Sequence, residues 1–99
     1  MYRFIRTATV KNAALLPSAL AFASQVTAHL NKTYSINMCF GAEQFGSLCI
    51  HWHFDADNLD KMQQVNEKLM TDPDYAALLE KYSDVWAEGA MHDTLVRLA

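Results

Sequence analysis

Alternation of apolar and polar side chains predicts two β-strands in the middle of the chain. The alternation covers residues 34–40 and 47–54, and the segment between them, GAEQFG, reads as a hairpin loop bounded by glycines. A hairpin that places Cys39 opposite Cys49, and Asn37 opposite His51, keeps the two sets of side chains on separate faces. The face expected to meet the helices then holds Ile36, Met38, Phe40, Leu48, Ile50, Trp52 and Phe54.

A first strand and a first helix are predicted before this hairpin. Residues 2–10, rich in β-branched and aromatic side chains, predict a strand. Residues 12–32 have apolar positions at three- and four-residue spacing, which indicates an amphipathic helix. Asn12 can cap this helix, although Pro17 is tolerated only in a first turn and so favours a start nearer Leu16.

Two further helices and a last strand follow the hairpin. The second helical region runs from Leu59 to Met70, after Asp57 or Asn58 as a cap, and breaks at TDPD. Asp72 then caps a third helix with Pro73 in its first position. This helix is predicted to end at Gly89, and its buried stripe consists of Tyr75, Leu78, Leu79, Tyr82 and Trp86. Residues 92–98 read as a short final strand, so the order βαββαβ predicts a ferredoxin-like α+β fold: an antiparallel four-stranded sheet with the helices on one face.

Length and composition indicate one soluble domain over residues 1–99. Hydrophobic residues make up 52% of the chain, which is enough for a core and leaves apolar surface for a partner subunit. The net charge is −3 and no Lys/Arg cluster occurs. Nucleic acid and anionic membrane surfaces are therefore not expected as partners.

The cysteine count and the N-terminal segment favour the cytoplasm. Only Cys39 and Cys49 occur, without a CxxC motif, and both are expected to be reduced. The start lacks the continuous apolar run of a signal peptide, and the apolar stretch 13–30 is interrupted by polar residues. The sequence also has no Gly-rich phosphate loop, nucleophile elbow or HExxH motif, so we expect no organic cofactor.

The face of the sheet that the helices leave bare is predicted to be of mixed polarity. It would carry Asn37, Cys39, Cys49, His51 and His53. Such a face either meets solvent or packs against the sheet of a second subunit. The second arrangement gives a barrel-like homodimer with a lumen between the sheets.

Three motifs carry a resemblance to a known family. They are RTATVK in residues 6–11, Trp52 near the end of the third strand, and LMTDPDY in residues 69–75. Over nearly the whole chain their order and spacing resemble the dimeric α+β-barrel superfamily, and most of all its NIPSNAP-type domains. The resemblance implies dimerisation through the open sheet face, and it places Arg6 on the lumen face. The superfamily includes cofactor-independent monooxygenases, haem-degrading enzymes, cyclases and lactone isomerases, so the fold alone does not fix the chemistry.

His51 and His53 are the first candidate site residues. At positions i and i+2 their Cα atoms lie about 7 Å apart on one face. The pair could serve as general acid and base, or could be hydrogen-bonded polar residues of an interface. A metal would need a third ligand such as Asp55 or Cys49 to converge, and we assign no metal site.

Arg6 and Asn37 complete the candidate set. The Arg6 guanidinium could hold a carboxylate or enolate oxygen, and otherwise forms a surface or dimer salt bridge. Asn37 could orient His51 or a ligand, and otherwise is a polar sheet residue.

Two functions remain open from the sequence. In the first, the chain binds a small apolar or aromatic molecule, held between sheet and helices, in a lumen lined by His51, His53 and Arg6. It would act there as a cofactor-independent oxygenase, isomerase or cyclase, or only as a binder. In the second, it is a non-catalytic oligomeric module whose histidines lie at the dimer interface.

Overall fold

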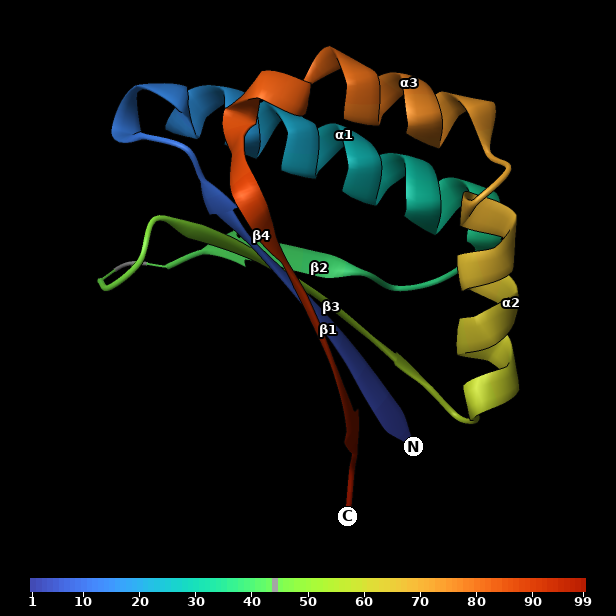
Figure 1. Ribbon diagram of the computed structural model, residues 1–99. Coiled ribbons are helices and arrows are strands. Elements are labelled where there is room, and N and C mark those ends of the chain that lie inside the picture. The colour runs from blue at the N-terminus through green and yellow to red at the C-terminus, as the bar shows by residue number, and fades with distance from the viewer. Residues whose placement is uncertain (44) are drawn as a thin grey trace.

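The computed structural model describes residues 1–43 and 45–99 and shows an antiparallel sheet with helices on one face (Figure 1). Its strands lie in the order β2-β3-β1-β4. The predicted ferredoxin-like arrangement is confirmed. In chain order the elements are β1 (Tyr2–Val10), α1 (Leu16–Tyr34), β2 (Cys39–Ala42), β3 (Cys49–Ala56), α2 (Leu59–Leu69), α3 (Pro73–Lys81) and β4 (Trp86–Arg97), with 3-10 turns at Ala13–Leu15 and Ser83–Val85.

We call the face of the sheet that the helices cover the inner face, and the other the open face. Helices α1 and α3 lie side by side over one end of the sheet, whereas α2 is turned away from them (Figure 1). The core fills the space between α1 and the inner face. Its buried side chains include Phe22, Val26 and Leu30 from α1, Ala8 and Val10 from β1, and Ile50, Trp52 and Phe54 from β3.

Helix α1 begins at Leu16, as the position of Pro17 predicts. Asn12 lies instead before the short 3-10 turn, and its side chain makes no capping hydrogen bond. Among the described residues, Ala13–Tyr34 is the one helical segment long and apolar enough to cross a membrane. Here it covers the sheet and buries one face, formed by Ala19, Phe22, Ala23, Val26, Thr27 and Leu30.

The predicted strand over residues 34–40 is wrong for residues 34–38. Helix α1 continues to Tyr34 and ends at Ser35, which adopts the left-handed conformation at φ 53°. The side-chain amide of Asn31 then binds the backbone of Met38, accepting from its N–H at 2.7 Å and donating to its carbonyl at 3.0 Å. Because Asn31 takes up the hydrogen bonds that a neighbouring strand would make, β2 starts only at Cys39.

The late start of β2 changes the register of the hairpin. Cys39 lies opposite His53, and Gly41 lies opposite His51. The predicted pairs of Cys39 with Cys49 and of Asn37 with His51 are therefore wrong. The predicted loop, residues 41–46, begins with the last two residues of β2 and contains residue 44, which lies outside the described residues.

Helix α3 is shorter, and β4 longer, than predicted. The helix ends at Lys81, and Trp86 begins β4 instead of completing the helix. Gly89 lies inside this strand at φ 67°, within a bulge: β1 advances from Ala8 to Val10 while β4 passes from Met91 to Trp86. Glycine tolerates this backbone because it has no Cβ.

The predicted caps of the last two helices are confirmed. Asn58 accepts a hydrogen bond from the backbone N–H of Lys61 at the start of α2. Asp72 caps α3 by accepting from the N–H groups of Asp74 and Tyr75. Met70, placed on the apolar face of α2 by its spacing, is instead 80% exposed after the helix ends.

Candidate functional site

The register of the sheet separates the residues that the sequence places in one lumen. Arg6 lies opposite Trp52, whereas Thr7 lies opposite His51 and Ile5 opposite His53. Directly paired residues share a face, so Arg6 and Trp52 belong to the inner face and the two histidines to the open face. The expectation of a single lumen lined by Arg6, His51 and His53 is therefore wrong.

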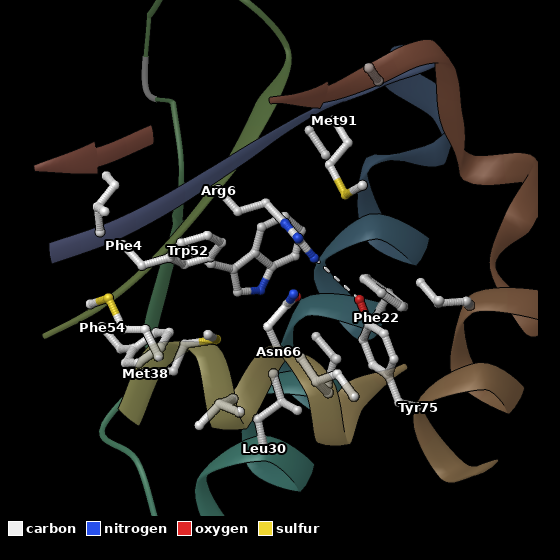
Figure 2. A pocket seen from close by; sticks show the side chains of 18 of the residues that line it. Phe4, Arg6, Phe22, Leu30, Met38, Trp52, Phe54, Asn66, Tyr75 and Met91 are labelled. Carbon is white, nitrogen blue, oxygen red and sulfur yellow. Dashed lines mark hydrogen bonds between the residues drawn. The ribbon is translucent and has the colours of Figure 1, made fainter. Parts of the chain in front are cut away.

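Arg6 instead belongs to a cavity of about 900 Å³ between the inner face and the helices, which we call the inner cavity (Figure 2). Its wall is mostly apolar and is built from the strands β1, β3 and β4 on one side and the three helices on the other. A volume of this size suits a small organic molecule. Representative lining residues are Phe4, Phe22, Met38, Phe54, Met62 and Met91.

Arg6 is held in place by partners from two other elements. Its guanidinium makes a two-point ion pair with Asp93, its neighbour on β4, with Nε–Oδ1 at 2.7 Å and the second nitrogen–oxygen distance at 3.0 Å. A third guanidinium nitrogen donates to the Tyr75 hydroxyl at 3.3 Å. The hydrogen bond to Asp93 raises the pKa of Arg6 against the opposing effect of burial, so the side chain stays charged.

These contacts make the polar end of the inner cavity a group of donors with little net charge. The Asp93 carboxylate neutralises the Arg6 cation. Tyr75 accepts from Arg6, and its own hydroxyl proton remains available to donate. Such a group favours an uncharged or delocalised oxygen, such as a carbonyl or an enolate, over a fully charged anion.

The indole of Trp52 supplies a further donor. Trp52 is 5% exposed, and its Nε1 is buried without a hydrogen-bond partner. Its indole nitrogen, the Asn66 amide and the Arg6 guanidinium turn toward the same part of the cavity (Figure 2). A buried donor without a partner costs about 1–3 kcal/mol. Thr27 carries the other unpaired buried side-chain atom among the described residues, but it does not line the cavity.

The open face carries the histidines in separate surroundings. His51 shares a hydrogen bond with Glu43, with Nε2 and Oε1 3.0 Å apart. His53 lies opposite Cys39 on β2. Asn37 is exposed in the segment before β2, away from His51. The structure therefore brings together neither the two histidines with Arg6 nor Asn37 with His51.

Four residues near or in the inner cavity were missed as site residues. Sequence patterns assigned Trp52 and Tyr75 to the core, and assigned nothing to Asn66 or Asp93. The rings of Trp52 and Tyr75 do pack in the core, but each carries a polar atom at its end, and that atom faces the cavity (Figure 2). Amphipathic aromatics often combine these two roles.

A second polar cluster, centred on Asp72, connects α1 to the start of α3. The Oδ2 atom of Asp72 accepts from the Tyr34 hydroxyl and lies 2.7 Å from Nε2 of His29. Burial alone would raise the pKa of Asp72, but the hydrogen bonds from Tyr34, His29 and the Tyr75 backbone outweigh burial and hold it well below its usual range. Burial and the hydrogen bond to Asp72 raise the pKa of Tyr34 to about 12. The cluster is internally satisfied, which favours a structural role.

Comparison with known proteins supports the fold but no specific activity. No protein-family model matches the sequence, and no curated protein matches it. Several solved structures do share its fold. A NIPSNAP-family protein of unknown function from Agrobacterium tumefaciens is 22% identical, with a TM-score of 0.81, over 100% of this chain and 88% of its own. An uncharacterised NIPSNAP domain protein from Burkholderia xenovorans is 16% identical, with a TM-score of 0.82, over 100% and 95%.

An enzyme also appears among the similar structures. SnoaB, a cofactor-independent oxygenase from Streptomyces nogalater, is 9% identical, with a TM-score of 0.70, over 98% of this chain and 91% of its own. The resemblance predicted from RTATVK, Trp52 and LMTDPDY is thus confirmed at the level of the fold. At these identities the likeness does not carry a reaction from one protein to another.

Proposed function

We propose that the protein binds a small apolar or aromatic molecule in the inner cavity, and that an oxygen of this molecule accepts hydrogen bonds at the cavity's polar end. The observation that carries the proposal is the buried Trp52 indole N–H, which has no protein partner and faces the cavity. A ligand oxygen between Trp52 and Arg6 would satisfy it once the side chains that now cover the indole N–H move aside. The apolar wall would hold the rest of the molecule.

The chemistry of the wall favours binding and polarisation over proton transfer by a histidine. Among the described residues that line the cavity there is no His, Asp, Glu or Cys. Donors at a carbonyl oxygen stabilise the negative charge that develops there when the carbonyl enolises. Cofactor-free oxygenation or isomerisation of a molecule that enolises readily would fit this arrangement. The proposal itself requires only binding.

Replacing Trp52 with phenylalanine tests this proposal, since phenylalanine keeps an aromatic ring but removes the N–H. We choose two probes of similar shape: 2-acetylnaphthalene, which has a carbonyl oxygen, and 2-isopropenylnaphthalene, which has a methylene group in its place. We expect the wild-type protein to bind the ketone more tightly, and W52F to bind it about tenfold more weakly because one buried hydrogen bond is lost. Binding of the hydrocarbon should change little. Calorimetric titration measures both.

Trp86→Phe is the matched control, because Trp86 also lines the cavity and contacts Trp52, but its indole N–H is not a buried, unpartnered donor. If the two variants weaken ketone binding equally, the loss comes from ring size and the role of the Trp52 N–H is refuted. If the wild-type protein binds the two probes with equal affinity, the polar end does not select an oxygen.

The proposal further includes self-association through the open face. No helix among the described residues covers this face, and its β1 side chains Ile5, Thr7 and Thr9 are only partly buried. A facing copy would enclose them. His51 and His53 would then line the space between the two sheets, where their action as acid and base stays a prediction.

Sedimentation equilibrium at micromolar concentration is expected to give about twice the chain mass of 11.2 kDa. A monomer under these conditions would contradict self-association. A dimer that binds neither naphthalene probe would instead support the alternative of a non-catalytic oligomeric module.

A further inference from the structure

Three potential metal ligands meet at the end of the β2–β3 hairpin, on the open face. They are Glu43, Cys49 and His51, and their ligand atoms all lie within 4.8 Å of one another. Cys49 and His51 belong to β3, and Glu43 directly follows β2, so the register of the hairpin brings the three together. The inner cavity lies on the other face, so this cluster takes no part in the ligand binding proposed above, although a second copy facing the open face would enclose His51.

The register explains why these three side chains converge. Cys49 and His51 are two positions apart on β3 and therefore share a face. The backbone N–H of Glu43 donates to the carbonyl of Cys49 at 3.0 Å, which continues the β2–β3 pairing one step past Ala42 and Ile50. Glu43 thus lies beside Cys49 and diagonal to His51. Across from His51 stands Gly41, where a Cβ would meet nothing within 4 Å, so the space over the imidazole is open.

The ligand atoms are already near the spacing that a tetrahedral metal ion requires. Nε2 of His51 and Oε1 of Glu43 lie 3.0 Å apart. Zinc bonds of about 2.0–2.3 Å at tetrahedral angles place neighbouring ligand atoms about 3.3–3.6 Å apart. The other oxygen of Glu43, Oε2, lies 3.1 Å from where a Cβ on Gly46 would stand, so the glycine leaves space for the carboxylate at this position. Side-chain movements on the order of 1 Å would bring the three ligand atoms to the spacing that a bound zinc ion requires.

In the single chain, the burial of the three ligands suits a metal centre that solvent can reach. Cys49 is 8% exposed and provides a shielded sulfur, whereas the side chains of His51 and Glu43 are 41% and 29% exposed. A thiolate, an imidazole and a carboxylate together are typical zinc ligands, and three protein ligands leave one position for water. On binding, the Cys49 thiol loses its proton to solvent and the thiolate bonds to the metal.

We propose that Glu43, Cys49 and His51 form a binding site for zinc or a similar divalent transition metal, with a fourth position open to water. The sequence alone left the third ligand unresolved between Asp55 and Cys49. The structure pairs Asp55 with Arg3, at 2.8 and 3.0 Å, and places Cys49 beside His51. The other His/Asp cluster, at His29 and Asp72, uses its ligand atoms for hydrogen bonds with Tyr34 and α3.

The test is a titration of the full chain with Co²⁺ under reducing conditions, followed by absorbance. We expect one equivalent to bind and to give both the thiolate-to-cobalt charge-transfer band and the intense visible bands of four-coordinate cobalt, and Zn²⁺ to displace it. C49S should lose the charge-transfer band. H51A and E43Q should bind at least ~10-fold more weakly.

The matched controls are Cys39 and His53, which face each other as the next residue pair on the open face beyond Gly41 and His51. Cys39→Ser removes the other thiol and His53→Ala the other histidine, and both should bind cobalt like the wild-type protein. Circular dichroism checks that each variant folds, and H51A keeps the test decisive if C49S does not fold. No thiolate band in the wild-type protein, or a band that is lost in C39S and kept in C49S, would overturn the proposal.

Discussion

Replacing Phe22 with alanine is expected to lower the free energy of unfolding by about 4 kcal/mol. Phe22 is 5% exposed at the centre of an aromatic cluster on the inner face. Its ring meets the rings of Trp52, Tyr82 and Trp86 edge-on, with centroids 5.5–6.1 Å apart. Alanine removes all three contacts and leaves a void that the rigid β-sheet cannot close.

Urea unfolding monitored by tryptophan fluorescence measures this effect. Leu20→Ala is the matched control, since Leu20 lies on the same helix but is 37% exposed, and we expect a loss below about 1 kcal/mol. A loss below about 1.5 kcal/mol for F22A would show that the aromatic cluster adds little. Phe22 also lines the inner cavity, so F22A should enlarge that cavity.

Replacing Asp72 with alanine is expected to cost about 3 kcal/mol, which lowers the melting temperature by about 15 °C. The change removes the cap of α3 and leaves the Tyr34 hydroxyl and His29 without their shared acceptor. Asp74→Ala serves as control, because Asp74 lies in the same first turn but is exposed. We expect its cost to stay below about 0.5 kcal/mol. Equal costs for the two variants would contradict the role assigned to Asp72.

The same cluster predicts how stability depends on pH. The Asp72 pKa is lower in the folded than in the unfolded chain, so its stabilising effect is complete above about pH 4 and is lost as the pH falls further. The Tyr34 pKa is raised to about 12, so its hydrogen bond stabilises the fold below about pH 10 and is lost between there and pH 12. In Asp72→Asn, the free energy of unfolding should fall less steeply below about pH 4 than it does in the wild-type protein. If the variant loses stability at low pH as steeply as the wild-type protein, that loss comes from other carboxyl groups.

Local chemistry made parts of this fold predictable and other parts not. The strand predicted over residues 47–54 is observed two residues later, as Cys49–Ala56. This strand and the α3 start at Asp72 and Pro73 follow from alternation, a capping carboxylate and a fixed proline φ, all of which act within a few residues. The start of β2 depends instead on Asn31 holding the Met38 backbone. That contact joins the end of a helix to the segment before a strand, and no local sequence pattern predicts it.

The site shows the same division. The position of Arg6 was taken from a family resemblance. Along β1, however, Arg6 alternates with Phe4, Ala8 and Val10 on one face of the strand, and Ala8 and Val10 are buried. This pattern alone already favours the inner face. The donor role of Trp52 could not be read from alternation, because its spacing reports only that the ring is buried. Whether the indole N–H finds a partner depends on every residue around the cavity.

Strand β3 also limits how this chain can change in length. Its alternating positions give Trp52 and Phe54 to the inner cavity, and Cys49, His51 and His53 to the open face. Inserting or deleting one residue within Cys49–Ala56 would turn every later side chain to the other face, and a change before His51 would exchange indole and imidazole between the two surfaces. Length changes in this strand therefore preserve both surfaces only when they come in pairs of residues.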